Sequence, residues 1–264
     1  MLTRVTAVEY VRPMESGRTS PLLVRCARSD GSIIEVVAKF SDFCDQQEEN
    51  LAMEAVSACL AGDLGLPVPE PVFVSIPDDW TEVVPDEARR QRILQSSRVA
   101  FGSRLVTGGY STWTPDTRIG EGMVDTAAAI FTFDAISQNP DRRSENPNCL
   151  VRGENIRIID HELAFGHGVV LGWRPPWTAG GLNWLERKGA HIFRADLRRA
   201  AGVDYDAIKA TWLSVDDNRL TAYGASLPTE WATAANRVQS ALNLIWSARA
   251  KIDACLAEIQ RVLS

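Results

Sequence analysis

Five polar residues in this chain have the types and the order that phosphoryl transfer requires. They are a lysine in a β-prone run, a glutamate on the helix expected next, an aspartate and an asparagine separated by four residues, and an aspartate after an apolar run: Lys39, Glu54, Asp141, Asn146 and Asp160. In phosphoryl transfer a lysine neutralises phosphates and a carboxylate holds it, one aspartate orients the acceptor hydroxyl, and an asparagine and another aspartate hold magnesium. Their order therefore predicts a kinase-type centre.

Lys39 and Glu54 indicate a functional site only if they form an ion pair. Lys39 lies in the run Val36-Val37-Ala38-Lys39-Phe40, which is similar to the strand that carries the lysine of protein kinases. Taken alone, it would more often be a solvated lysine at the edge of a sheet. Glu54 lies beside the apolar stripe of the following helix and is expected to pair with Lys39, although Glu48 and Glu49 are rivals on the same helix.

The segment from Gln138 to Asn148, QNPDRRSENPN, is the most informative in the chain. Asp141 and Asn146 have the spacing of a kinase catalytic loop. Asparagine, aspartate and proline also favour plain turns, so the loop alone leaves both interpretations open. The run Ile156-Arg157-Ile158-Ile159 then places Asp160 at the end of an apolar strand, and this second acidic site favours the functional interpretation.

The first part of the chain reads as β-rich. Strands are expected at 22–28 and 33–40, joined by the turn Ser29-Asp30-Gly31, and again at 67–76 and 99–106. A helix is expected over 52–64, where apolar residues recur at helical spacing before Gly65 and Pro67. Residues 77–95 are polar and predict a surface excursion, and Gly108-Gly109 predicts a connection between two parts of the fold.

The second part reads as helical. A helix over 124–135 ends near Asn139-Pro140, a short hairpin covers 149–159, and a loop rich in glycine, tryptophan and proline covers 166–181. One long amphipathic helix is expected from about 228 to 263. This order predicts an α+β protein with two lobes, a β-rich nucleotide-binding lobe at 1–106 and a helical catalytic lobe at 107–264.

Composition narrows the class of protein. The 264 residues are 45% hydrophobic and 23% charged, which is typical of a globular protein. No apolar run approaches the ~20 residues of a membrane-spanning helix, and the five cysteines are scattered, so we expect reduced thiols, a cytoplasmic location and no membrane. The net charge of −6 argues against direct nucleic-acid binding.

Other catalytic patterns have less support. His161-Glu162 with His167 resembles a zinc-binding H-E-x-x-H motif, but the second histidine is six residues from the first instead of four. His191 is isolated and is interpreted as structural. The chain has neither a G-x-S-x-G elbow nor a P-loop sequence, so hydrolase and P-loop functions are not expected.

Several segments, in the same order, resemble the bacterial HipA-like kinase family, and more its compact single-chain branch than its longer toxins. They are Val37–Phe40, Glu54–Pro71, Phe101-Gly102-Ser103, Phe133–Leu150 and Ile158–Phe165, with Asn-Pro-Asp-Arg-x3-Asn-Pro-Asn and Ile-Asp-His as the specific signature. The resemblance implies a protein-kinase-like fold distantly related to phosphoinositide kinases. It also implies the use of ATP with Mg²⁺ and phosphorylation of protein serine or threonine.

Carried over residue by residue, the resemblance implies roles for the polar set. Asp141 would be the catalytic aspartate, Asp160 the principal Mg²⁺ ligand, Asn146 the second ligand, and Lys39 the phosphate-binding lysine with Glu54 as its partner. Two positions depart from the family. Arg143 stands where a histidine is common, and the nucleotide-covering loop has no G-x-G-x-x-G. Its nearest counterpart is 16–21, in which Gly17, Thr19 and Ser20 would lie near the nucleotide; an ordinary surface turn would have the same composition.

Three functions remain open on the sequence. The resemblance favours a serine/threonine protein kinase, with an antitoxin-like protein as a partner and Thr19 or Ser20 as a site of autophosphorylation. A small-molecule kinase would place similar catalytic parts on the same architecture. A pseudokinase that uses the fold only for binding is less consistent with the intact set of Lys39, Asp141, Asn146 and Asp160.

Overall fold

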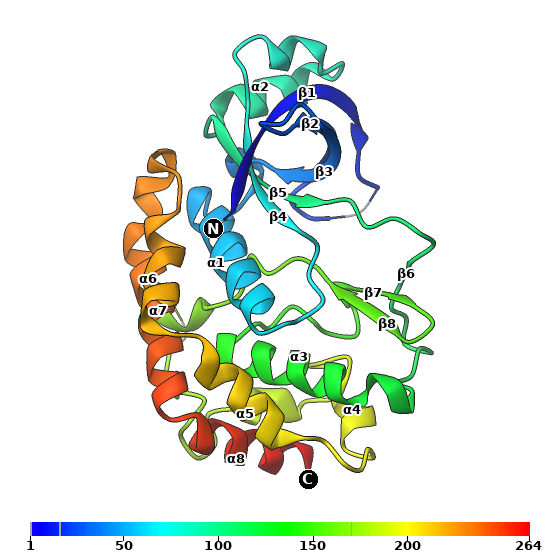
Figure 1. Ribbon diagram of the computed structural model, residues 1–264, viewed down its shortest axis with the longest axis vertical. Helices are drawn as coiled ribbons and strands as arrows, with labels where there is room; N and C mark the ends of the chain where they lie inside the picture. The colour runs from blue at the N-terminus through cyan, green and yellow to red at the C-terminus, as the bar shows by residue number, and fades with distance from the viewer. Residues whose placement is uncertain (1, 16, 170) are drawn as a thin grey trace.

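The computed structural model describes residues 2–15, 17–169 and 171–264, and it is a mixed α+β fold (Figure 1). The strands are β1 (Thr3–Pro13), β2 (Leu22–Ala27), β3 (Ile33–Lys39), β4 (Pro71–Ser75), β5 (Val99–Arg104), β6 (Ser111–Thr112), β7 (Cys149–Arg152) and β8 (Asn155–Ile158). The α-helices are α1 (Glu48–Asp63), α2 (Glu87–Gln95), α3 (Val124–Ser137), α4 (Arg194–Leu197), α5 (Tyr205–Ser214), α6 (Asp217–Ala225), α7 (Ala235–Ala250) and α8 (Ile252–Leu263).

The first five strands close into a barrel in the order β1-β2-β3-β5-β4. All neighbours are antiparallel except β1 and β4, whose parallel pairing from Thr3 with Val72 closes the ring. Gly102 on β5 faces the interior, where an added Cβ would lie 2.4 Å from Val36 Cγ1 and 2.7 Å from Val74 Cγ2. A larger residue would therefore force the barrel wall apart at this point.

The apolar side chains form two cores. The smaller core fills the barrel and includes Val24, Val36 and Val74. The larger core joins α1 to α3, α5, α6, α7 and α8. Although α1 lies between two barrel strands in the sequence, nearly every face of it is buried, and it contacts β4 and β5 as well as α6 and α7. It therefore connects the barrel to the helical part below it in Figure 1.

A small sheet in the order β6-β7-β8 lies between the barrel and α3 (Figure 1). The β7–β8 hairpin has the predicted position, and its end leads directly into Asp160. The backbone N–H of Ile158 donates to the carbonyl of Pro67 at 3.0 Å, which ties β8 to the segment between α1 and β4.

The surface excursion predicted at 77–95 is mostly exposed, but the sequence does not anticipate its local structure. Residues 77–95 contain a helix, α2, whose N-cap Asp86 accepts from the N–H of Arg89 at 2.7 Å, and Ile93 is the one residue that the helix buries. One buried position gives no helical period, so the polar sequence conceals it.

The predicted single helix over 228–263 is instead three pieces: a 3-10 segment at Thr229–Ala234, then α7 and α8. Lys251 has non-helical dihedrals (φ −122°, ψ 31°) where the chain turns from α7, which contacts α1, to α8, which contacts α5. Neither glycine nor proline marks this break, which explains why the sequence does not reveal it. No helix in the described part of the chain has the length and apolar character needed to cross a bilayer.

Trp231 fastens the segment before α7 to the barrel. Its indole N–H donates to the carbonyl of Val99 at 2.9 Å, its ring meets Phe73 edge-on at 5.4 Å, and 2% of the residue is exposed. Trp80 is similarly buried, but its indole N–H has no partner among the described residues. The two tryptophans therefore form a matched pair for measuring this hydrogen bond.

We predict that Trp231→Phe lowers the free energy of unfolding by about 1–3 kcal/mol more than Trp80→Phe, because only the first change leaves a buried carbonyl unpaired. Urea unfolding of both variants and the wild type measures the difference. Equal losses in the two variants would show that the indole hydrogen bond adds nothing to the attachment.

Candidate functional site

Lys39 stands at the centre of a cluster of carboxylates. Its ammonium Nζ lies 2.7 Å from Asp160 Oδ1 and 3.1 Å from Glu162 Oε2, and it also forms an ion pair with Glu54. The side chain of Lys39 is only 10% exposed. We call these four residues, which come from β3, α1 and the segment after β8, the Lys39 cluster.

Local sequence explains how Lys39 and Asp160 reach this position. Along β3, Ile34, Val36 and Ala38 face the barrel interior, so the period of two places Lys39 on the outer face, toward α1. Asp160 has a left-handed backbone (φ 59°), a conformation that aspartate tolerates better than most residues, and it turns the chain sharply after β8. Asn50 on α1 donates from Nδ2 to the carbonyl of Glu162 at 3.2 Å, which holds this turn against the helix.

One ammonium surrounded by three carboxylates leaves an excess of two negative charges within the Lys39 cluster. Burial alone would lower the pKa of Lys39, but the charges of Asp160, Glu54 and Glu162 outweigh it and raise the pKa well above its ordinary value. Burial would raise the pKa of Glu54, yet Lys39 and His161 hold it well below its usual range. Burial and neighbouring carboxylates raise the pKa values of Asp160 and Glu162.

Asp141 lies in a loop whose hydrogen bonds orient its carboxylate. Asn146 donates from Nδ2 to Asp141 Oδ2 at 2.7 Å, and Asn148 donates to the same oxygen at 3.1 Å. Arg143, at the position where the family commonly has histidine, places its Nε 3.7 Å from Asp141 Oδ1. The two residues predicted from their spacing, Asp141 and Asn146, are thus in direct contact.

The predicted nucleotide loop connects β1 to β2. Gly17 has a left-handed φ of 117°, Thr19 is buried, and Ser20 is partly buried; Ser16, the first residue of the predicted loop, lies outside the described residues. The loop reaches the Lys39 cluster through Arg18, whose guanidinium lies 3.5 Å from Glu162 Oε1 and also pairs with Asp45.

Glu162, Arg18 and Asn148 are the site residues that the sequence analysis missed. Glu162 lies in the Ile158–Phe165 segment but was named only as part of a zinc motif, whose two histidines have different partners in the structure. His161 lies 3.7 Å from Glu54, whereas the His167 ring packs against Trp173 at a tilt of 38° and contacts Ser240 at 3.2 Å. The signal that was available for Glu162 is its place two residues after Asp160, on the same side of the turn.

Oxygen donors for a divalent cation are present. Glu54, Asp160 and Glu162 each offer an oxygen within 4.8 Å of the others, although Lys39 shares this space. Because Asn146 uses its amide nitrogen on Asp141, its carbonyl oxygen is the atom left for a cation. Carboxylate and amide oxygens are hard ligands, so the chemistry of this donor set fits Mg²⁺.

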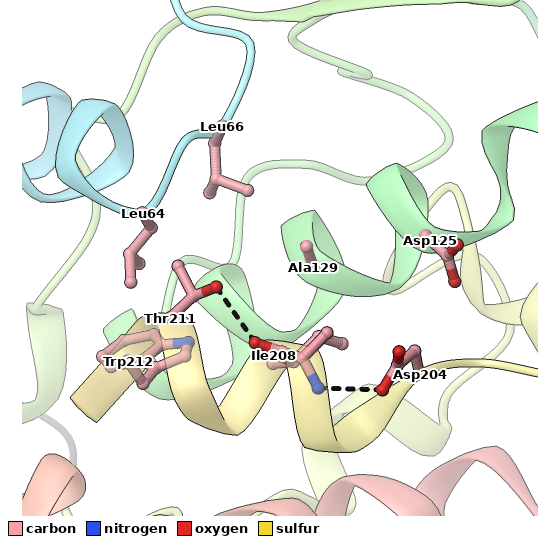
Figure 2. Close-up of a pocket in the computed structure, with 9 residues that line it drawn as sticks. Leu64, Leu66, Asp125, Ala129, Asp204, Ile208, Thr211 and Trp212 are labelled. Atoms are coloured by element: carbon pink, nitrogen blue, oxygen red, sulfur yellow. Dashed lines mark hydrogen bonds between the residues drawn. The ribbon is translucent and has the colours of Figure 1, made fainter. Parts of the chain in front are cut away.

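A pocket of about 200 Å³ lies elsewhere, where the end of α1 faces α3 and α5 (Figure 2). Leu64, Ala129 and Trp212 line it, and Asp125 and Asp204 stand toward one end in Figure 2. None of the residues predicted for phosphoryl transfer lines this pocket, so it is distinct from the candidate active site.

Comparisons with known proteins point to a family of kinases. The sequence model of a family described as HipA-like kinase matches residues 7–260. The solved structure of the Helicobacter pylori proinflammatory kinase CtkA has a TM-score of 0.51 and 11% identity, with 98% of this chain and 99% of that chain covered. At this identity the likeness shows a shared fold alone.

Two structures of CtTel1 resemble the chain much more weakly. The complete dimer has a TM-score of 0.35 and the open conformation 0.33, each at 13% identity and covering 12% of the CtTel1 chain and 94% and 91% of this one. These scores are too low to support any conclusion. No curated protein sequence matches the chain.

Glu54 and Glu162 should respond oppositely to removal of their charge. A carboxylate with a lowered pKa contributes stability that is present above its unfolded pKa and is lost as pH falls through its folded pKa. A carboxylate with a raised pKa has the opposite effect on the pH dependence of stability. The folded state gains stability as pH falls, because the group takes up a proton more readily there than in the unfolded chain.

We predict that Glu54→Gln lowers the free energy of unfolding by about 1–3 kcal/mol at both pH 8 and pH 5. Glu162→Gln should leave stability unchanged or higher at pH 8 and should reduce the gain that the wild type shows on going to pH 5. Urea unfolding at the two pH values measures both effects. A loss for Glu162→Gln at pH 8 equal to that for Glu54→Gln would contradict the excess of negative charge.

Proposed function

The chain belongs to the HipA-like kinase family, and from this premise we propose that it is an ATP- and Mg²⁺-dependent kinase that phosphorylates serine or threonine of a protein. The observation that carries the proposal is the ion pairing of Lys39 with Asp160 and Glu54. These residues lie 121 and 15 positions from Lys39, and a kinase needs the same groups together for phosphate and metal.

Lys39, Glu54, Asp160 and Asn146 each have a role in this proposal. Lys39 neutralises phosphate oxygens of ATP, and Glu54 keeps the ammonium in place because its low pKa keeps it ionised. Asp160 and Asn146 would hold Mg²⁺, which supplies positive charge to the phosphates when bound. Burial and the charge of Glu54 raise the pKa of Asp160, and a bound cation would stabilise its ionised form.

Asp141 accepts the proton of the acceptor hydroxyl, or orients that hydroxyl for attack. The hydrogen bonds from Asn146 and Asn148 go to its Oδ2, while Oδ1 faces Arg143 at 3.7 Å. These contacts support a fixed carboxylate orientation with Oδ1 turned to the acceptor. Arg143 is 53% exposed, so it can move aside or contact an acidic part of the substrate.

We place the division between a nucleotide-binding lobe and a catalytic lobe at 106/107, with ATP held between them. The closed barrel of β1 to β5 supports this division, because it lies wholly within the first 106 residues and has its own apolar core. The attachment of α1 to the larger core means that the first lobe also contributes a helix to the second.

We predict that Asp141→Asn leaves nucleotide binding close to that of the wild type but lowers turnover by about 10²–10⁴-fold, because the variant cannot accept the proton. Asp160→Asn should weaken Mg²⁺-dependent ATP binding. Calorimetric titration with and without Mg²⁺ and a steady-state assay of ATP consumption measure the two effects. Asp116→Asn, at an exposed turn, is the control. Wild-type phosphoryl transfer in both site variants would refute the assignment.

The nature of the acceptor is tested by the mass of the protein itself. Phosphorylation of a hydroxyl in the nucleotide loop would add about −1.5 to −2 charge beside the ATP phosphates. We predict one added phosphate after incubation with ATP and Mg²⁺, on Ser20 in preference to Thr19, because Thr19 is buried. Intact-mass analysis with peptide mapping detects it, and Asp141→Asn should lack it. ATP consumption without any change in mass would favour a small-molecule acceptor.

A further inference from the structure

Asp134 on α3 is a buried carboxylate that accepts hydrogen bonds from three side chains. Its Oδ1 accepts from Asn139 Nδ2 at 2.8 Å, and its Oδ2 accepts from Arg142 Nε at 2.6 Å and from His191 Nε2 at 3.0 Å. The side chains of Asp134, Arg142 and His191 are all 0% exposed. We call Asp134, Asn139, Arg142 and His191 the Asp134 network.

One arm of the Asp134 network reaches the backbone on both sides of the candidate active site. Arg142 follows Asp141 directly, and its Nη1 donates to the carbonyl of Asn148 and, at 3.4 Å, to the carbonyl of Ile159. Ile159 immediately precedes Asp160. A single guanidinium therefore links the carbonyl of Asn148, whose side chain donates to Asp141, to the carbonyl that precedes the proposed metal ligand Asp160.

The other arm reaches Asp141 through Asn139. The side-chain amide of Asn139 donates to Asp134, and its carbonyl oxygen accepts from the backbone N–H of Asp141 at 3.1 Å. Any shift of the Asp134 carboxylate would therefore be transmitted to the backbone of Asp141 through this arm and through Arg142.

His191 determines the position of Asp134 from a distant part of the sequence. The backbone N–H of Phe193 donates to His191 Nδ1 at 3.2 Å, so the imidazole proton lies on Nε2 and points at Asp134. The same segment contacts the Asp141 loop twice more, because Ile192 N–H donates to the carbonyl of Arg142 at 3.1 Å and Ser144 N–H donates to that of Gly189 at 3.0 Å.

The charges in the Asp134 network also have a definite state. Burial alone would raise the pKa of Asp134, but Arg142 and His191 hold it well below its usual range. Burial lowers the pKa of His191 in spite of the nearby carboxylate, so the imidazole stays neutral. The network is therefore one buried ion pair, Asp134 with Arg142, and a neutral hydrogen-bond donor, His191.

We propose that Asp134 and His191 are positioning residues of the kinase reaction, which hold Asp141 and Asp160 at a fixed separation through Asn139 and Arg142. This inference rests on the proposed function for its catalytic consequence. Neither residue touches the reacting groups; both act on the backbone that carries them. Positioning of this kind matters because a displacement of about 1 Å costs up to about 100-fold in rate.

Two substitutions of His191 separate its two hydrogen bonds. His191→Gln keeps a donor where Nε2 stands and loses the acceptor for Phe193 N–H. His191→Asn keeps the acceptor and is too short to donate to Asp134. Thr132→Val is the control, because Thr132 is buried on α3, the helix that carries Asp134, and its hydroxyl has no partner among the described residues.

We expect His191→Asn to lower kcat by about tenfold or more, within the range for misplacement, with wild-type ATP affinity and one nucleotide bound per chain. His191→Gln and Thr132→Val should keep kcat within about twofold of the wild type. A purely structural role would lower the nucleotide stoichiometry together with kcat. Wild-type kcat in His191→Asn, or equal losses in the Asn and Gln variants, would overturn the proposal.

Amide hydrogen exchange provides a readout that needs no turnover. His191→Asn should raise exchange at the amides of 141–148 and 159–161 relative to Thr132→Val, while the barrel strands stay unchanged. If His191→Asn does not fold, Asn139→Ala cuts one arm, keeps the ion pair, and should give the same local change. Exchange that rises uniformly, or not at all, would overturn the positioning role. Absence of ATP turnover in the wild type would instead refute the proposed function. The hydrogen-exchange result would then decide by itself whether Asp134 and His191 position the loop that carries Asp141.

Discussion

The sharing of one buried ammonium by three carboxylates is the interaction on which the rest of the site depends. Lys39 meets Glu54 from α1 and Asp160 and Glu162 from the turn after β8, so a barrel strand, a helix and a hairpin end must all reach one point. Ion pairs of this kind contribute little or even oppose folding once desolvation is counted. The apolar cores on both sides of the cluster therefore hold its elements together.

The burial of α1 explains how Glu54 is kept in register with Lys39. Nearly every face of α1 is covered, by β4 and β5 on one side and by α6 and α7 on the other. Close-packed interiors resist small displacements, so this helix is expected to move only together with the larger core. The loop between β1 and β2 contrasts with α1. Its residue Arg18 and the partner Asp45 are both well exposed, so their ion pair is weak in water. Motion at the site should accordingly be concentrated in the loop between β1 and β2.

The fold depends mainly on the apolar residues of the sequence, whereas the candidate site depends on a few short polar segments. CtkA shares the fold over nearly the whole chain at 11% identity, which is feasible because barrel and helix cores require apolar residues of suitable size more than particular ones. The polar segments around Lys39, Asp141 and Asp160 are short, and they carry the family resemblance. The fold therefore allows many apolar residues to be exchanged for one another. The few polar residues of the candidate site cannot be exchanged in this way, because each has its own chemical role in the proposed reaction.

The sequence alone indicated four of the five barrel strands, α1, α3 and the β7–β8 hairpin, because hydrophobic period, turn residues and proline act over a few positions; it did not single out β1, whose pairing with β4 closes the barrel. It also singled out Asp141 and Asn146 by their spacing in one loop, and the structure shows that the two side chains are hydrogen-bonded. Only the tertiary structure decided that Glu162 and Arg18 join Lys39, that His191 braces Asp134, and that the last helix breaks at Lys251. The reason is that burial and hydrogen-bond partners more than 50 residues apart leave no local pattern, and a polar residue shows its role only when its distant partner is known.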